Sequence, residues 1–166
     1  MGSSNKSEEF QSPFVTNLKK VLPEWIDYNG HMNVAYYTLA FDDALDDFLD
    51  KIGIGEDYVT EFQNGPYALQ ANYHYLDELL VDEEFRVRIY LVDTTEKCFH
   101  SAMEIFNENT GLVSAVCEQI TMNVNLELRK SNKYPDWVRE KFDLMIKSQK
   151  DKKLPSQIGK PLGLKS

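Results

Sequence analysis

The chain has 166 residues, which is enough for a single domain to bury a core without disulfides or a metal ion. Hydrophobic residues make up 42% of it and charged residues 27%, proportions that are ordinary for a soluble globular protein. A net charge of −9 and a pI near 4.8 argue against a nucleic-acid partner, because nucleic-acid-binding domains carry a basic surface.

The cysteines and the apolar runs indicate a location. Cys98 and Cys117 offer neither a disulfide framework nor the ligand spacing of a metal site. No apolar run reaches the length of a membrane span, and the N-terminus lacks the apolar core of a signal peptide. We therefore expect a cytoplasmic protein with no membrane partner and no bound metal.

One predicted helix dominates the first half of the chain. Residues 1–13 predict a flexible lead, and Phe14–Trp25 predicts a first strand or extended segment. From Asn33 to Ile52 apolar residues recur at intervals of three and four, which places them on one helical face. Asn33 is a candidate N-cap and Gly53 a candidate stop. The opposite face, favoured as a solvated surface over a metal site, carries Asp42, Asp43, Asp46, Asp47 and Asp50.

The second half of the chain predicts strands. Gly53–Gly65 predicts a loop with one helical turn, and strand-like runs follow at residues 69–75, 85–91, 98–106 and 112–126. Asn107–Gly111 is typical of a hairpin turn. Pro135 is placed to begin a helix that runs to about Lys147, and residues 148–166 form a basic tail that we expect to be flexible. In the first of these strands one face is predicted to hold Leu69, Ala71, Tyr73 and Tyr75.

This order of elements predicts one α+β domain over residues 14–147. Strands that follow one another through short connections form an antiparallel sheet, and a long amphipathic helix must bury its apolar face against that sheet. We expect a sheet of about five strands wrapped around one long central helix.

A polar cluster stands directly before the helix, in the stretch Trp25–Asn33. Asp27 is placed to attack a carbonyl carbon or to activate a water molecule. The backbone amides around Asn33 and Val34 lie at the positive end of the helix dipole and are candidates to stabilise an oxyanion. Gly30 lets backbone and substrate approach closely.

The supporting residues of the cluster also have a structural interpretation. Asn29 and His31 are placed to hold Asp27 or an attacking water in position. Asp27 and Asn29 are equally residue types that cap turns, and a histidine at a subunit contact would give the same pattern as a catalytic one. The cluster taken alone leaves both interpretations open.

The cluster and the order of elements resemble a known family over most of the chain, from about residue 14 to 142. Asp27–Gly30 matches the D-x-x-G at the start of the helix in hotdog-fold thioesterases of the 4-hydroxybenzoyl-CoA thioesterase type, where the catalytic Asp of that family lies. Asp27–Asn33 is also similar to the D-x-N-x-H-x-N of acyl-carrier-protein thioesterases. The chain also resembles the betainyl-CoA thioesterase modules associated with carnitine dehydrogenase. The residues that carry this resemblance are Tyr75–Glu78, Glu96–Lys97, His100, Glu104 and Ala115–Gln119.

The resemblance implies an acyl-CoA thioesterase that acts on a small or medium acyl group, betainyl among the candidates, and needs no cofactor. It implies Asp27 as the catalytic residue and the Val34 amide as the group that binds the carbonyl. It also implies a homodimer or tetramer with sites between subunits, which would cover an open sheet edge. Aromatic side chains are expected to line the acyl pocket, as a cation–π cage if the acyl group is betaine-like: Trp25, Tyr28, Tyr36, Tyr67 and Tyr73.

Alternatives accompany this hypothesis. One alternative is an acyl-carrier-protein thioesterase. Another is a non-catalytic hotdog module that binds a thioester or a partner protein. Hotdog hydratases are disfavoured, because they space Asp and His five apart with a Pro between them, whereas His31 follows Asp27 by four and Gly30 replaces the Pro. Glu118 falls on an apolar strand face, where structural pairing is favoured over a second acid in the site. The sequence leaves open the acyl group and whether Asp27 acts as nucleophile or general base.

Overall fold

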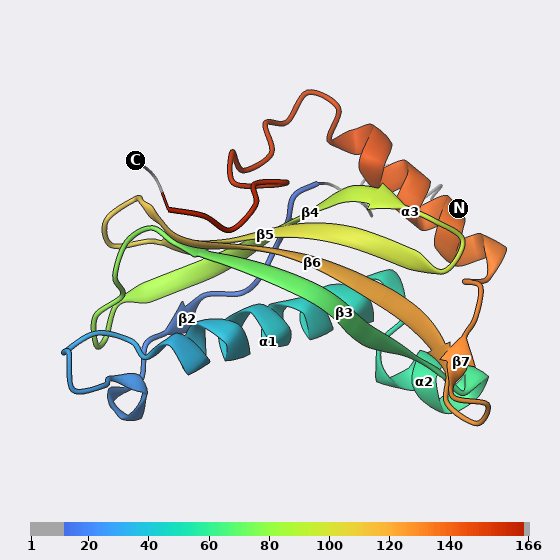
Figure 1. The fold of residues 1–166 in the computed structure, drawn as a ribbon, viewed down its shortest axis with the longest axis horizontal. Coiled ribbons are helices and arrows are strands. Elements are labelled where there is room, and N and C mark those ends of the chain that lie inside the picture. The colour runs from blue at the N-terminus through green and yellow to red at the C-terminus, as the bar shows by residue number, and fades with distance from the viewer. Residues whose placement is uncertain (1–11, 165–166) are drawn as a thin grey trace, which may run out of the picture.

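One long helix lies against one antiparallel sheet in the computed structural model, which describes residues 12–164 (Figure 1). The helix, α1, spans Val34–Ile52. The four long strands are β3 (Asn64–Tyr75), β4 (Glu84–Thr94), β5 (Cys98–Asn107) and β6 (Val113–Asn125). They lie in the order β4-β5-β6-β3, and the short strands are β1 (Phe14–Val15) and β2 (Lys19–Lys20), both paired to β4, and β7 (Lys130–Ser131), paired to β6. This is the predicted α+β arrangement of a sheet wrapped around a central helix.

Both ends of α1 follow from the residues that flank it. The side-chain oxygen of Asn33 accepts a hydrogen bond from the Ala35 N–H at 3.0 Å, which satisfies one amide that lacks a helical acceptor. Gly53 ends the helix with a left-handed φ of 85°, and its N–H donates to the carbonyls of Asp50 and Leu49. The predicted cap, stop and bounds of this helix are confirmed.

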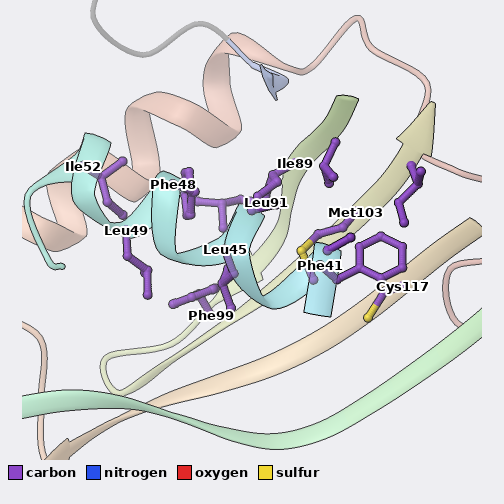
Figure 2. Close-up of a cluster of buried hydrophobic side chains, with 14 of the residues drawn as sticks. Phe41, Leu45, Phe48, Leu49, Ile52, Ile89, Leu91, Phe99, Met103 and Cys117 are labelled. Atoms are coloured by element: carbon purple, nitrogen blue, oxygen red, sulfur yellow. The ribbon is translucent and has the colours of Figure 1, made fainter. Parts of the chain in front are cut away.

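The core lies between the apolar face of α1 and the inner face of the sheet (Figure 2). Phe48 of the helix contacts Phe14 of β1 and Phe99 of β5, with ring centroids 5.7 and 6.4 Å apart. Each buried ring of this kind contributes a few kcal/mol to stability, so the helix is held in one position relative to the strands. The alternating residues of β4 are fully buried on this face, as predicted: Phe85, Val87, Ile89 and Leu91.

The first segment differs from the single strand expected over Phe14–Trp25. It divides into β1, β2 and a 3-10 turn, η1 (Pro23–Trp25). The break between the two strands lies at Thr16, whose hydroxyl accepts from the Val87 N–H at 3.0 Å where a strand would offer a backbone carbonyl. Pro23 then begins the 3-10 turn, because its fixed φ suits a first helical position. With β7 added, the sheet has seven strands where about five were expected.

The connection between α1 and β3 is more regular than the predicted loop with one turn. It forms a seven-residue helix, α2 (Glu56–Phe62), with Glu56 and Asp57 in its first turn, where the helix dipole favours acidic residues. The buried Tyr58 anchors it, and its hydroxyl donates to Asn123 on β6 at 3.3 Å. This tertiary contact therefore stabilises a helix that is too short to be predicted from its own sequence.

β3 begins at Asn64 and contains an irregularity that the predicted alternation misses. Its pairing with β6 shifts register between Ala68 and Gln70, so Leu69 leaves the face that Tyr73 and Tyr75 share and is 54% exposed. The hairpin predicted between β5 and β6 is present, and Gly111 in its turn has a φ of 75°, which favours glycine.

The C-terminal helix α3 (Asp136–Ser148) agrees with the prediction, with Pro135 at its N-cap. Beyond it Gln149 is buried, and its side chain bonds to the backbone of Leu91 and to Ser12, whose hydroxyl donates to Gln149 Oε1 at 2.7 Å. These contacts attach the start of the predicted tail to β4. The flexibility expected for residues 148–166 stays a prediction. Residues 1–11 of the predicted lead lie outside the described residues. No helix within residues 12–164 is long and apolar enough to cross a membrane.

The acidic face of α1 predicts a pH-dependent stability. Partial burial, followed by the charges of Asp42, Asp50, Asp43 and Asp47, raises the pKa of Asp46. A carboxylate with a raised folded-state pKa destabilises the folded protein above that pKa. Asp46→Asn should therefore raise the free energy of unfolding at pH 7, by about 0.2–0.5 kcal/mol for each like-charge i,i+4 pair removed.

The gain should shrink as pH falls toward the ordinary Asp value of 3.8, because the folded wild type takes up its proton first. Urea unfolding at a series of pH values measures it. Glu127→Gln in the exposed β6–β7 turn is the matched control and should change stability by less than about 0.5 kcal/mol. A loss of stability in Asp46→Asn at pH 7 would contradict the account.

Candidate active site

The segment before α1 folds into a closed turn that brings its two ends together. The Asp27 N–H donates to the His31 carbonyl at 3.1 Å, and the Asn33 N–H donates to the Trp25 carbonyl at 2.8 Å. At the tip, Gly30 has a φ of 85°, a conformation that side chains disfavour, and its N–H donates to the Asp27 carbonyl at 3.0 Å. The turn therefore sets Asp27 beside the residue that caps the helix.

Both oxygens of the Asp27 carboxylate accept hydrogen bonds. Oδ1 accepts from the backbone N–H of Asn29 at 2.8 Å, and Oδ2 accepts from Asn33 Nδ2 at 3.3 Å. The first contact is the turn cap that the structural interpretation expects. The second ties the carboxylate to the start of α1, so capping and orientation of the acid occur together in one residue.

The Val34 N–H is the first amide of α1. A first helical amide has no acceptor within its own helix, and none is recorded for Val34 among residues 12–164. Val34 as a whole is 53% exposed. This amide is able to donate to a carbonyl oxygen at the positive end of the helix dipole.

His31 and Asn29 are less directly engaged with Asp27 than the sequence indicates. His31 Nδ1 lies 3.1 Å from the carbonyl oxygen of Met32, and because a carbonyl only accepts, Nδ1 is the donor in this contact. The structure gives His31 no hydrogen bond to Asp27 among the described residues, and Asn29 reaches Asp27 through its backbone only.

A cleft opens between the start of α1 and the end of β3. It has a volume of about 420 Å³, and among the predicted residues it includes His31 and Val34. Tyr37, one turn after Val34, and Tyr75 at the end of β3 also line it, in edge-to-face contact at 5.4 Å. Tyr37 lies on the helical face that the spacing of three and four predicts to be buried, and it is 4% exposed. That spacing does not indicate that its ring also borders a cleft. The full lining is His31, Met32, Val34, Tyr37, Tyr75, Asp77 and Glu78.

The five aromatic residues expected in an acyl pocket lie in different places. Trp25 and Tyr36 stack on each other at 5.4 Å, and Tyr73 stacks on Tyr75 at 6.4 Å, next to the cleft. Tyr28 is 98% exposed on the turn. Tyr67 lies toward the other end of β3, where its hydroxyl accepts from Arg129 at 2.6 Å. None of the five lines the cleft itself, and Tyr73 stacks on Tyr75, which does.

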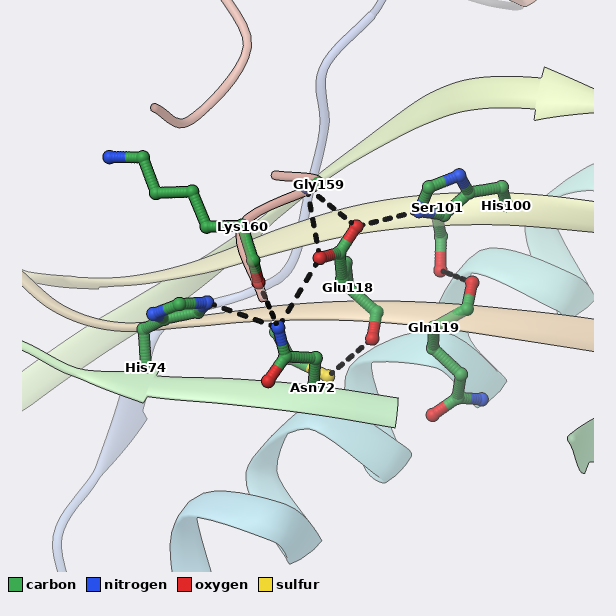
Figure 3. A network of polar contacts seen from close by, with 9 residues as sticks. Asn72, His74, His100, Ser101, Glu118, Gln119, Gly159 and Lys160 are labelled. Carbon is green, nitrogen blue, oxygen red and sulfur yellow. Dashed lines mark hydrogen bonds and ion pairs between the residues drawn. The ribbon is translucent and has the colours of Figure 1, made fainter. Parts of the chain in front are cut away.

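Two other reactive groups lie outside this site. Burial raises the pKa of the Cys117 thiol to about 12, which leaves little thiolate for nucleophilic attack. Glu118, the next residue, points away from α1 (Figure 3). Cys117 belongs to the buried core on the other side of β6, because successive side chains of a strand alternate. The Glu118 carboxylate lies 3.0 Å from His100 Nε2 and accepts from the backbone N–H of Gly159 at 3.0 Å. The structural pairing predicted for Glu118 is confirmed, and His100 is its partner.

The sequence is similar to a family model and to curated proteins that are all described as thioesterases. The sequence matches the family model of the thioesterase-like superfamily over residues 21–142. It is 26% identical to a betainyl-CoA thioesterase of Pseudomonas aeruginosa, over 87% of this chain and 91% of that one. It is 29% identical to an L-carnitine dehydrogenase/betainyl-CoA thioesterase of Rhizobium meliloti over 99% of this chain, which spans only 33% of that longer relative.

A solved structure with the same fold comes from Staphylococcus aureus, where the protein is in complex with CoA. It superposes with a TM-score of 0.87 at 24% identity and covers 94% of this chain and 98% of its own. The fold likeness therefore extends over nearly the whole of both chains.

The capping role of Asn33 predicts how its replacement changes stability. Asn33→Ala removes the N-cap of α1 and should lower the free energy of unfolding by about 1 kcal/mol. Asn33→Ser keeps a cap oxygen and should recover most of that loss. Chemical unfolding of the two variants beside the wild type measures the difference, and equal stability of Asn33→Ala and the wild type would show that the cap is not needed.

Proposed function

Since the chain belongs to the thioesterase-like superfamily, we propose that it is an acyl-CoA thioesterase whose reaction takes place at the start of α1, with Asp27 as the catalytic residue. One observation carries the proposal. Asp27 is held by Asn33, the residue that also caps the helix whose first amide, on Val34, has no recorded acceptor. Asn33 therefore holds the acid, Asp27, near the first amide of the helix, on Val34, which is the candidate oxyanion donor.

In the proposed reaction the Val34 N–H donates to the thioester carbonyl oxygen and stabilises the negative charge that develops there. Asp27 takes a proton from a water molecule while the water oxygen bonds to the carbonyl carbon. The C–S bond then breaks, and the CoA thiolate leaves and takes up the proton. The products are the free acid and CoA.

A second route uses the same geometry. An Asp27 oxygen bonds to the carbonyl carbon and expels the thiolate, and water then hydrolyses the resulting anhydride. In both routes His31, Asn29 and Gly30 shape the turn or border the cleft, and Asn33 is a positioning residue. Neither route needs a cofactor beyond the CoA that the substrate carries.

The proposed substrate class is a short acyl-CoA, with betainyl-CoA as the first candidate. The curated relatives from Pseudomonas aeruginosa and Rhizobium meliloti are named for that activity. A cleft of about 420 Å³ suits a small acyl group, which would lie between His31, Val34 and Tyr75. We further propose a cytoplasmic location, in which the free thiols of Cys98 and Cys117 stay reduced.

We also propose a homodimer formed along β3. This twelve-residue strand ends the sheet order and pairs only with β6 among the described strands. A long open edge favours pairing with a second chain. Two apolar side chains within this strand are exposed, Leu69 at 54% and Tyr75 at 49%. Because Tyr75 also borders the cleft, a partner along this edge would help to enclose the substrate.

The catalytic proposal predicts the effect of removing one charge. Asp27→Asn keeps the shape and the Asn29 contact but loses the base or nucleophile, so kcat should fall by about 10²–10⁴-fold. Thiol release from a panel of acyl-CoAs, betainyl-CoA included, measures it, and circular dichroism checks the fold. Asp42→Asn on the solvated face of α1 is the matched control and should retain wild-type activity.

Near wild-type turnover by Asp27→Asn across the panel would refute this role for Asp27. The same assay with carrier-protein thioesters of matched acyl groups distinguishes the two classes of substrate. We expect faster release from CoA.

The edge proposal predicts a dimer in solution. Analytical ultracentrifugation should give twice the chain mass of 19.2 kDa. Leu69→Lys places a charge on the open edge and should shift the protein toward monomer, with a parallel loss of thioesterase activity. A wild type that sediments as a monomer at micromolar concentration would contradict the proposal.

A further inference from the structure

One wall of the cleft carries charges that no cation balances. Asp77 and Glu78 line it directly after Tyr75, and neither side chain forms an ion pair with any residue in the described range 12–164. Asp77 is half-buried and Glu78 is exposed. Glu104, a partly buried carboxylate on β5, does have such a partner, Arg88. A pair of unbalanced carboxylates gives the cleft a negative potential.

The effect of this potential reaches the tyrosine beside it. Burial raises the pKa of Tyr37 to about 12, and the charges of Asp77, Glu78 and Glu83 add to the rise, against a lowering by the Leu79 N–H. The Leu79 N–H donates to the Tyr37 hydroxyl at 3.0 Å, which fixes the ring. The cleft therefore holds a fixed, neutral aromatic ring next to two carboxylates.

The other aromatic wall is open to solvent. Tyr75 meets Tyr37 edge to face, with ring centroids 5.4 Å apart and planes at 78°. Its other neighbour, Tyr73, is stacked behind it with planes 7° apart. Two rings at a steep angle form a corner, and carboxylates at its rim complete an environment that attracts a cation without hydrogen-bond donors.

The corner lies in the same cleft as Val34 and His31. An acyl carbonyl bound at the Val34 N–H would therefore place the group attached to it against the tyrosines and the carboxylates. A quaternary ammonium two bonds from the carbonyl carbon fits this placement. A negatively charged acyl group would be repelled, and a neutral one would gain only apolar contact.

We propose that Tyr75, Asp77 and Glu78 are specificity-determining residues that select an acyl group bearing a quaternary ammonium. The inference rests on the proposed thioesterase reaction at α1 and concerns which acyl group that reaction accepts. Tyr37 forms the fixed back of the corner, and the two carboxylates supply the charge preference.

The test compares two substrates of one shape. Betainyl-CoA carries the cation, and tert-butylacetyl-CoA is its neutral isostere, with carbon in place of nitrogen. The ratio of their kcat/KM values isolates the contribution of the charge. Wild type should favour betainyl-CoA by about tenfold or more. In Asp77→Asn/Glu78→Gln the ratio should fall toward one, because kcat/KM falls far more for betainyl-CoA than for the neutral isostere.

Two matched controls accompany it. Asp57→Asn/Glu61→Gln removes the same charge from exposed positions of α2, which lies away from the start of α1 (Figure 1), and should keep the wild-type ratio. Tyr75→Phe keeps the ring and should keep most of the ratio, whereas Tyr75→Leu removes the ring and should lower it.

Several results would overturn the inference: a ratio unchanged by the double substitution in the cleft, an equal loss on both substrates, or a wild type that cleaves other acyl-CoAs but neither of these. Failure of the catalytic proposal is distinguishable, because there Asp27→Asn would hydrolyse betainyl-CoA at the wild-type rate. If Asp27→Asn is inactive and the ratio is unaffected, only the specificity inference fails.

Discussion

The side chain of Asn33 joins the two parts on which the site depends. Its oxygen accepts from the Ala35 N–H and fixes the first turn of α1, and its nitrogen donates to the Asp27 carboxylate. One amide group thus places an acid at the positive end of a long helix dipole. A side chain with only an acceptor or only a donor would satisfy one of these partners and leave the other without a hydrogen bond.

This local arrangement is rigid because the helix behind it is buried. Phe48 and its neighbours on α1 pack against the inner face of the sheet, so the start of the helix has a fixed position relative to the end of β3 (Figure 2). The cleft lies between those two ends, with Tyr37 contributed by the helix and Tyr75 by the strand. The core therefore sets the spacing of the groups between which the acyl group is proposed to bind.

The sequence predicts those features that depend on residues close together in the chain. The bounds of α1, its cap at Asn33 and the alternation of β4 all follow from local pattern and agree with the structure. The division of the first strand at Thr16 and the bulge at Leu69 do not, because each depends on a hydrogen bond or a register with a distant strand.

The same distinction applies to the site. Asp27 and Asn33 are close in sequence and in space, and their pairing follows from the turn between them. Tyr75, Asp77 and Glu78 reach the cleft only because the sheet returns β3 to the start of α1, which no local pattern can indicate. Tyr28 shows the reverse case, since it follows Asp27 directly in the sequence but is 98% exposed and does not line the cleft.

The most direct test of the central claim is a crystal structure of Asp27→Asn with an uncleaved acyl-CoA bound. The account predicts the thioester carbonyl oxygen at about 3 Å from the Val34 backbone nitrogen, with the acyl group between Tyr37 and Tyr75. A thioester bound elsewhere, for example on the outer face of the sheet near Glu118, would contradict it.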